Sequence, residues 1–236
     1  MNFLISIIAA IILVVIGRDF IKKHATLCYL LTTLLSIALV AGSFSGIIWT
    51  LPPWFTTTIL PILIKSTFAT SLFVVVMYTG AFKNGSKLMK FLMPIRAELS
   101  IIASILTLAH NIIFGRYHFV ILFTNPKSMS INMLLAAIIS VVLMAIMFPL
   151  MITSFPSIRK KMKYKTWKKI QRFAYLFYGL IYVHVMLIML PVATTGNSQY
   201  ILNVLIYSLV FITYAVMRIN KALNKKSSTK VQATIN

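Results

Sequence analysis

Acidic residues are almost absent from this chain of 236 residues. Asp19 and Glu98 are the only two, and they stand against 23 lysines and arginines. Two carboxylates cannot supply the oxygen cage of a calcium or magnesium site. The single cysteine, Cys28, excludes an internal disulfide and any cysteine-rich zinc or iron–sulfur site. These shortages remove many metalloproteins from consideration.

Hydrophobic residues are abundant instead. They make up 60% of the chain, whereas charged residues make up 11% and the mean hydropathy is +0.93. A soluble domain carries about 25% charged residues, and a membrane helix needs about 20 apolar ones. Apolar runs lie at 2–16, 25–48, 59–81, 98–115, 131–154, 172–191 and 199–217. The sequence therefore predicts an all-α bundle of seven transmembrane helices.

The basic residues are distributed unevenly among the loops between these runs. Twenty of them fall in 17–24, 82–97, 155–172 and the C-terminal tail, whereas the alternate side receives only Lys65, Arg116 and Lys127. Because cytoplasmic loops attract Lys and Arg, this pattern predicts an external N-terminus and a cytoplasmic C-terminus. Membrane insertion and anionic lipid headgroups then account for the net charge of +21, and no nucleic-acid partner is expected.

Two of the four histidines, His110 and His184, lie well inside apolar runs, where ionisable residues are usually functional. Each lies 13 residues from the cytoplasmic start of its run, at Ala97 and Gln171, or about 20 Å along a helix. Two neutral imidazoles at one depth can hold one iron from opposite faces of a porphyrin, as in a b-type haem. The alternative is that each histidine simply bonds a neighbouring helix.

Several segments resemble the ferric-reductase-like transmembrane superfamily, and in particular the haem subunit of the bacterial methionine-sulfoxide reductase system (the YedZ/MsrQ type). They are the stretch 153–161, the stretch from Trp167 to Tyr175 with its basic residues, and His184. The similarity extends over about 25–217. It implies a six-helix core at 25–220, to which 1–24 adds a further helix and basic loop, and 221–236 forms a basic cytoplasmic tail.

The resemblance also implies the cofactors. The family has a first histidine where Gln171 stands here, thirteen residues before His184, so one haem b held by His110 and His184 is expected rather than two. Arg96, fourteen residues before His110, matches an arginine of the family. Arg96, Gln171 and Arg172 are expected to bind a haem propionate, FMN or quinone at the cytoplasmic side.

The expected function is electron transfer across the inner membrane of a bacterium. The donor would be a cytoplasmic flavin reductase or quinol, because the chain has no dinucleotide fingerprint and only about 19 residues follow the last run. The acceptor would be an extracytoplasmic redox protein, such as a methionine-sulfoxide reductase partner, or ferric iron. The remaining alternatives are a haem-free transport or substrate-binding subunit and a purely structural subunit.

The remaining histidines carry weaker expectations. His118 lies eight residues after His110 and beyond the apolar run, so it is expected at the membrane interface. His24 lies in a basic loop and is expected to be solvated.

The charge pattern makes the topology testable with reporter fusions. Green fluorescent protein fused after residue 236 should fluoresce, and alkaline phosphatase fused there should be inactive. Alkaline phosphatase inserted at Asn125 should be active, because that loop is expected outside the cell. The reverse pattern of activities would contradict the predicted orientation.

Overall fold

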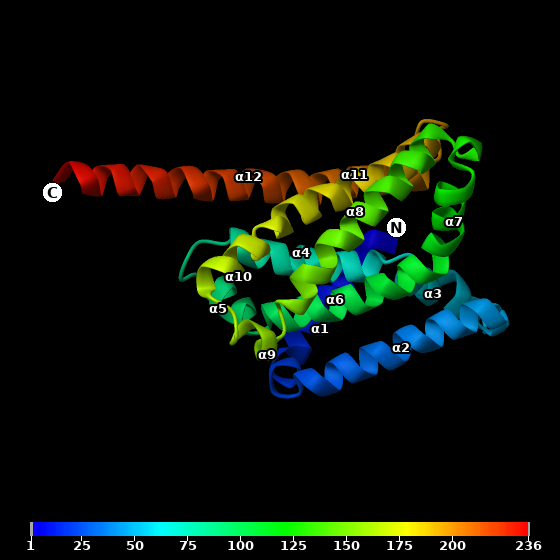
Figure 1. The fold of residues 1–236 in the computed structure, drawn as a ribbon, viewed down its shortest axis with the longest axis horizontal. Coiled ribbons are helices and arrows are strands. Elements are labelled where there is room, and N and C mark those ends of the chain that lie inside the picture. The colour runs from blue at the N-terminus through cyan, green and yellow to red at the C-terminus, as the bar shows by residue number, and fades with distance from the viewer. Residues whose placement is uncertain (1, 236) are drawn as a thin grey trace.

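The computed structural model describes residues 2–235, with side chains for 2–224, and this range contains helices and turns but no strand (Figure 1). The principal α-helices are α1 (Asn2–Lys23), α2 (Ala25–Ser45), α3 (Leu60–Ile64), α4 (Thr67–Ala81), α5 (Lys87–Leu92), α6 (Arg96–His110), α7 (Arg116–Thr124), α8 (Ile131–Ile152), α9 (Pro156–Arg159), α10 (Tyr164–Gln171), α11 (Phe173–Ala193) and α12 (Ser198–Ile235). Six helical segments are long and apolar enough to span a membrane, and a bent pair makes a seventh. The predicted all-α membrane bundle is confirmed.

The expected boundaries differ from the observed ones at three places. The first helix continues past the apolar run to Lys23, because its basic last turn suits the negative end of the helix dipole. The third span is interrupted between Ile64 and Thr67, where the chain bends by 48°. The fourth span continues beyond His110 through a π-helical turn, Asn111–Gly115, into α7.

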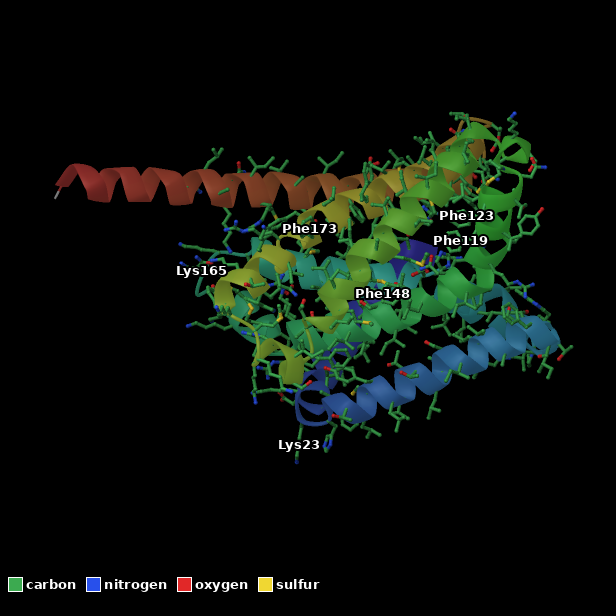
Figure 2. All side chains as sticks on the ribbon, in the orientation of Figure 1. Lys23, Phe119, Phe123, Phe148, Lys165 and Phe173 are labelled. Carbon is green, nitrogen blue, oxygen red and sulfur yellow. The ribbon has the colours of Figure 1, made fainter. Side chains whose placement is uncertain are left out.

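The segments richest in basic residues gather at one end of the bundle. Arg18 at the end of α1 donates from Nε to the carbonyl oxygen of Phe91 in α5 (2.8 Å), and Lys221 of α12 donates to Gly80 at the end of α4 (2.9 Å). Figure 2 shows Lys23 and Lys165 at this same end. The positive-inside rule requires such a grouping, and it remains a prediction that this end faces the cytoplasm.

Aromatic stacking joins α12 to the helices beside it. Tyr178 of α11 stacks on Phe211 with ring centroids 4.2 Å apart, and Phe3 of α1 stacks on Tyr207 at 3.6 Å. Tyr78 of α4 donates its hydroxyl to the carbonyl of Val210 (2.7 Å). Because lipid tails are as apolar as leucine, such close packing and interhelical hydrogen bonds hold a membrane bundle together.

Helix α1 belongs to this packed bundle. Its buried face carries Phe3, Ala10, Val14 and Ile21, and it contacts α4 and α12. Ala10 is completely buried, which fits the preference for small residues where membrane helices approach closely. The opposite face is exposed, so the neighbouring residues of α1 lie in very different surroundings.

Two adjacent valines provide a matched test of this packing. Val14 is 2% exposed and Val15 is 60% exposed. Val14→Ala should lower the free energy of unfolding by about 1–3 kcal/mol, because it leaves a cavity among packed helices. Val15→Ala should leave that free energy nearly unchanged. Thermal unfolding of the protein in detergent measures both, and equal effects would contradict the packing of α1.

Candidate functional site

His110 is the last residue of α6, and its ring is oriented by a hydrogen bond to another span. Its Nδ1 lies 2.8 Å from the carbonyl oxygen of Ile64, the last residue of α3. The ring of Phe114 lies 5.4 Å away, in the π-helical turn that follows. Single π-helical turns occur frequently at functional sites, because the wider turn changes the direction of the side chains around it.

His184 lies in the middle of α11 and faces α8. Its Nδ1 lies 3.2 Å from the carbonyl oxygen of Ala136 and 3.3 Å from Oγ of Ser140. Ser140 donates its own hydroxyl hydrogen to Ala136, at 2.9 Å, so its oxygen is available as an acceptor. Both partners of the His184 ring therefore accept.

These bonds fix the same tautomer in the two rings. A carbonyl oxygen can only accept, so Nδ1 carries the hydrogen in His110 and in His184. Neither Nε2 makes a hydrogen bond within the part of the chain that the structure describes. An imidazole bonded through Nδ1–H to a carbonyl, with Nε2 free, is the usual state of a metal-ligating histidine.

Both histidines are partly buried, and they lie at similar distances along their helices from the basic end of the bundle. His110 lies 14 residues from the start of α6 and His184 lies 13 residues after Gln171, each about 20 Å along the helix. Two neutral donors of this kind fit the axial positions of a haem iron.

Among the described residues, no three His, Cys, Asp or Glu side chains lie together in a group that could hold a metal ion. Haem needs only two protein ligands, so this absence bears on cation sites and not on the histidine pair.

A separate cavity of about 210 Å³ lies nearer the basic end of the bundle. Its polar lining residues are Arg96, Ser100, Ser104, Ser154, Arg159, Trp167 and Gln171. Arg96 and Gln171, which the sequence assigns to a cofactor site, therefore meet at one cavity although they are 75 residues apart. Arg172 is exposed and is not among the lining residues.

Arg96 and Arg159 give this cavity two cationic donors. Arg96 uses Nε to bond the carbonyl of Val76 (3.2 Å), and its Nη atoms make no other hydrogen bond among the described residues. Gln171 donates to Thr153 Oγ1 (3.0 Å), which leaves its amide oxygen as an acceptor. No acidic or histidine side chain lines the cavity in the described chain, so it suits an anionic or carbonyl-bearing ligand better than a ligated haem.

The cavity lies between the basic end of the bundle and the two histidines, and α6 and α11 contribute residues to both sites. Ser104 is six residues before His110 on α6, and Phe177 is seven residues before His184 on α11. These separations correspond to roughly 10 Å along the helix axes. A ligand in the cavity would therefore divide the long path between the basic end and the histidines into two shorter parts.

Sequence reasoning missed two residues of this cavity. Trp167, which the sequence placed in the family resemblance but not at a site, donates from Nε1 to the carbonyl of Thr153 (3.1 Å). The guanidinium of Arg159 lies over its ring, 4.6 Å from the centroid. Both belong to the stretches that carry the family resemblance, but their contacts depend on how the 155–172 segment folds back against α8.

The remaining histidines lie outside both sites. His118 is half-buried in α7, with the ring of Tyr117 5.5 Å away. His24 is exposed between α1 and α2, with the ring of Phe20 5.0 Å away. They serve as natural controls for experiments on the other two.

Residues 65–182 match the family described as ferric reductase like transmembrane component. This segment is half of the chain, includes His110 and Gln171, and ends two residues before His184. An uncharacterized protein of Treponema pallidum (strain Nichols) is 41% identical over 226 residues, which are 96% of this chain and 62% of that protein. The chain thus spans about three-fifths of the length of this relative. No solved structure matches the chain.

Proposed function

Because the chain belongs to the ferric reductase like transmembrane component family, we propose that it is a haem b subunit that carries electrons across a bacterial inner membrane. The proposed donor is a cytoplasmic flavin reductase or quinol, and the proposed acceptor is an extracytoplasmic redox protein of the methionine-sulfoxide reductase type. One observation carries the proposal: His110 and His184 each bond a carbonyl oxygen through Nδ1, which leaves Nε2 available to a metal.

The histidines would hold the haem, and their carbonyl partners would hold the histidines. A bis-histidine haem b, when bound, supplies a one-electron carrier without an open coordination position. His110 is oriented by Ile64, and His184 is oriented by Ala136 and Ser140. The apolar helices around the rings exclude water from this part of the membrane. The residues thus favour electron transfer over chemistry on a bound substrate.

The cavity at the basic end is the proposed point of electron entry. The cationic side chains of Arg96 and Arg159 would bind the phosphate or carbonyl oxygens of FMN or of a quinone. Its volume of about 210 Å³ is below the usual range for small-molecule sites, roughly 300–1,000 Å³, so a ring or headgroup fits better than a whole dinucleotide.

The first test of the proposal is the absorption spectrum of the purified protein. Protein from haem-supplemented cells should show reduced-minus-oxidised Soret and alpha bands. His110→Ala and His184→Ala should each abolish the low-spin spectrum, because one axial ligand is lost.

The matched controls are His24→Ala and His118→Ala, which should retain the spectrum. A wild-type protein that purifies without haem would overturn the proposal and favour the transport alternative. Equal loss in all four variants would show that the histidines act on folding instead. If haem is present and ferric iron, but no redox protein, reoxidises it, the acceptor would be iron.

Electron entry can be tested with two arginines that carry the same charge. A hydrogen bond to a charged group contributes about 1.5–3 kcal/mol, so Arg96→Gln should weaken apparent affinity for reduced FMN roughly tenfold or more. Arg172→Gln should have little effect, because Arg172 does not line the cavity. Stopped-flow reduction of the haem measures both. Equal slowing would indicate general electrostatic attraction rather than a defined site.

A further inference from the structure

The third membrane span is interrupted at a residue where an interruption is unexpected. Between α3 and α4 the backbone of Ser66 adopts the left-handed conformation, with φ of 59°, and it is the only non-glycine residue with positive φ in the described chain. Sharp bends in helices usually have a proline or glycine at the bend, but Lys65 and Ser66 are neither. A left-handed backbone at such a residue persists only where its surroundings hold it, and these conformations cluster at functional sites.

The interruption changes the hydrogen bonding of one carbonyl group. In a continuous helix the carbonyl of Ile64 would accept from the amide of Phe68, four residues later. No backbone amide donates to Ile64 in the described structure, and His110 Nδ1 takes that place at 2.8 Å. An unbonded carbonyl is costly in a membrane. The bond from His110 therefore supplies the donor that the carbonyl of Ile64 lacks because of the interruption.

Neighbouring helices hold the interruption on two sides. Ser66 Oγ lies 3.4 Å from Thr107 Oγ1, one turn before His110 on α6. Thr67 donates to the carbonyl of Ile62 (3.1 Å) and accepts from Ser6 of α1 (3.0 Å). Ser66 is buried, so the bend is enclosed by protein rather than exposed to lipid.

His110 and His184 differ in the kind of carbonyl that each of them bonds. His184 bonds the carbonyl of Ala136, in the interior of α8, at 3.2 Å, and this oxygen also accepts from Ser140. His110 bonds a helix-terminal carbonyl at the shorter distance of 2.8 Å. The orientation of His110 therefore depends on the backbone at the interruption, whereas that of His184 depends on an ordinary helix.

We infer that Ser66 is a positioning residue: its left-handed backbone turns the chain so that the Phe68 amide does not reach the carbonyl of Ile64, which is left for His110 and so fixes the tautomer and direction of that ring. This inference rests on the proposed function for its consequence, since the fixed ring is a proposed haem ligand. The backbone conformation, and not the Ser66 hydroxyl, carries the effect, because the bond to His110 comes from the main chain.

A crossed pair of substitutions separates the backbone from the hydroxyl. Ser66→Gly removes the hydroxyl and accepts positive φ freely, whereas Ser66→Thr keeps the hydroxyl and adds a β-branch that disfavours positive φ. Ser71→Thr adds the same methyl group at a buried position with ordinary helical backbone in α4, and serves as the control for crowding.

Two readouts follow these variants. In haem-loaded protein, Ser66→Gly and Ser71→Thr should keep the six-coordinate low-spin spectrum, and Ser66→Thr should convert part of the haem to a five-coordinate high-spin form. In protein from haem-deficient cells, nitrogen NMR of labelled histidine should show Nδ1–H on His110, assigned with His110→Ala. That signal should persist in Ser66→Gly. In Ser66→Thr it should be lost or be accompanied by the signal of the other tautomer, Nε2–H.

The outcomes distinguish this inference from the proposed function. If Ser66→Gly lost the low-spin spectrum and the Nδ1–H signal while Ser66→Thr kept them, the effect would belong to the hydroxyl and the inference would be overturned. Wild-type spectra in both variants would also overturn it. If Ser71→Thr lost the spectrum and the signal as Ser66→Thr does, the effect would come from crowding by the added methyl group, and the inference would again be overturned. If the wild-type protein binds no haem, the proposed function fails, and the NMR pattern alone then decides the role of Ser66.

Discussion

The absence of water in the bilayer interior is the constraint on which this structure depends. Every backbone carbonyl there needs a donor from within the protein, so an interruption in a spanning helix must be matched by side chains on its neighbours. The break after Ile64 meets this requirement through His110 and Thr67. The same bond that satisfies the carbonyl leaves Nε2 of the histidine free, so the constraint on folding also prepares a metal ligand.

The basic residues act on a different part of the molecule. Most gather at one end of the bundle, where Arg218 and Lys221 donate to the carbonyl oxygen of Gly80 near the end of α4. The chain has only two acidic residues, and the partners of several cations are instead backbone carbonyls or aromatic rings. Arg96 and Arg159 belong to this end but also line the cavity, which gives them a proposed second role in electron entry.

Much of the architecture could be predicted from the sequence, because apolar runs and loop charges report directly on membrane insertion. The helix positions, the grouping of basic loops and the meeting of Arg96 with Gln171 required only helical spacing and a family resemblance. The interruption at Ser66 could not be predicted, since neither proline nor glycine marks it. Its cause is tertiary: contacts from α1 and α6 hold a backbone that local sequence disfavours.

The partners of the histidines could not be predicted from the sequence either. Spacing alone gave His110 and His184 matching depths, but Ile64 and Ala136 act through main-chain oxygens, which leave no residue-type signal in a sequence. For Arg172 the residue type suggested a role that its position does not support. It follows Gln171 directly and carries the charge of a cofactor ligand, yet it is exposed and lies outside the cavity lining.

The proposed ligation of one iron by two imidazoles can be tested by near-infrared magnetic circular dichroism of the oxidised, haem-loaded wild-type protein. That method identifies the pair of axial ligands from a charge-transfer band. We expect the band of bis-histidine ligation, with one haem per chain. A band typical of any other ligand pair, or a haem content near zero after haem supplementation, would contradict this ligation.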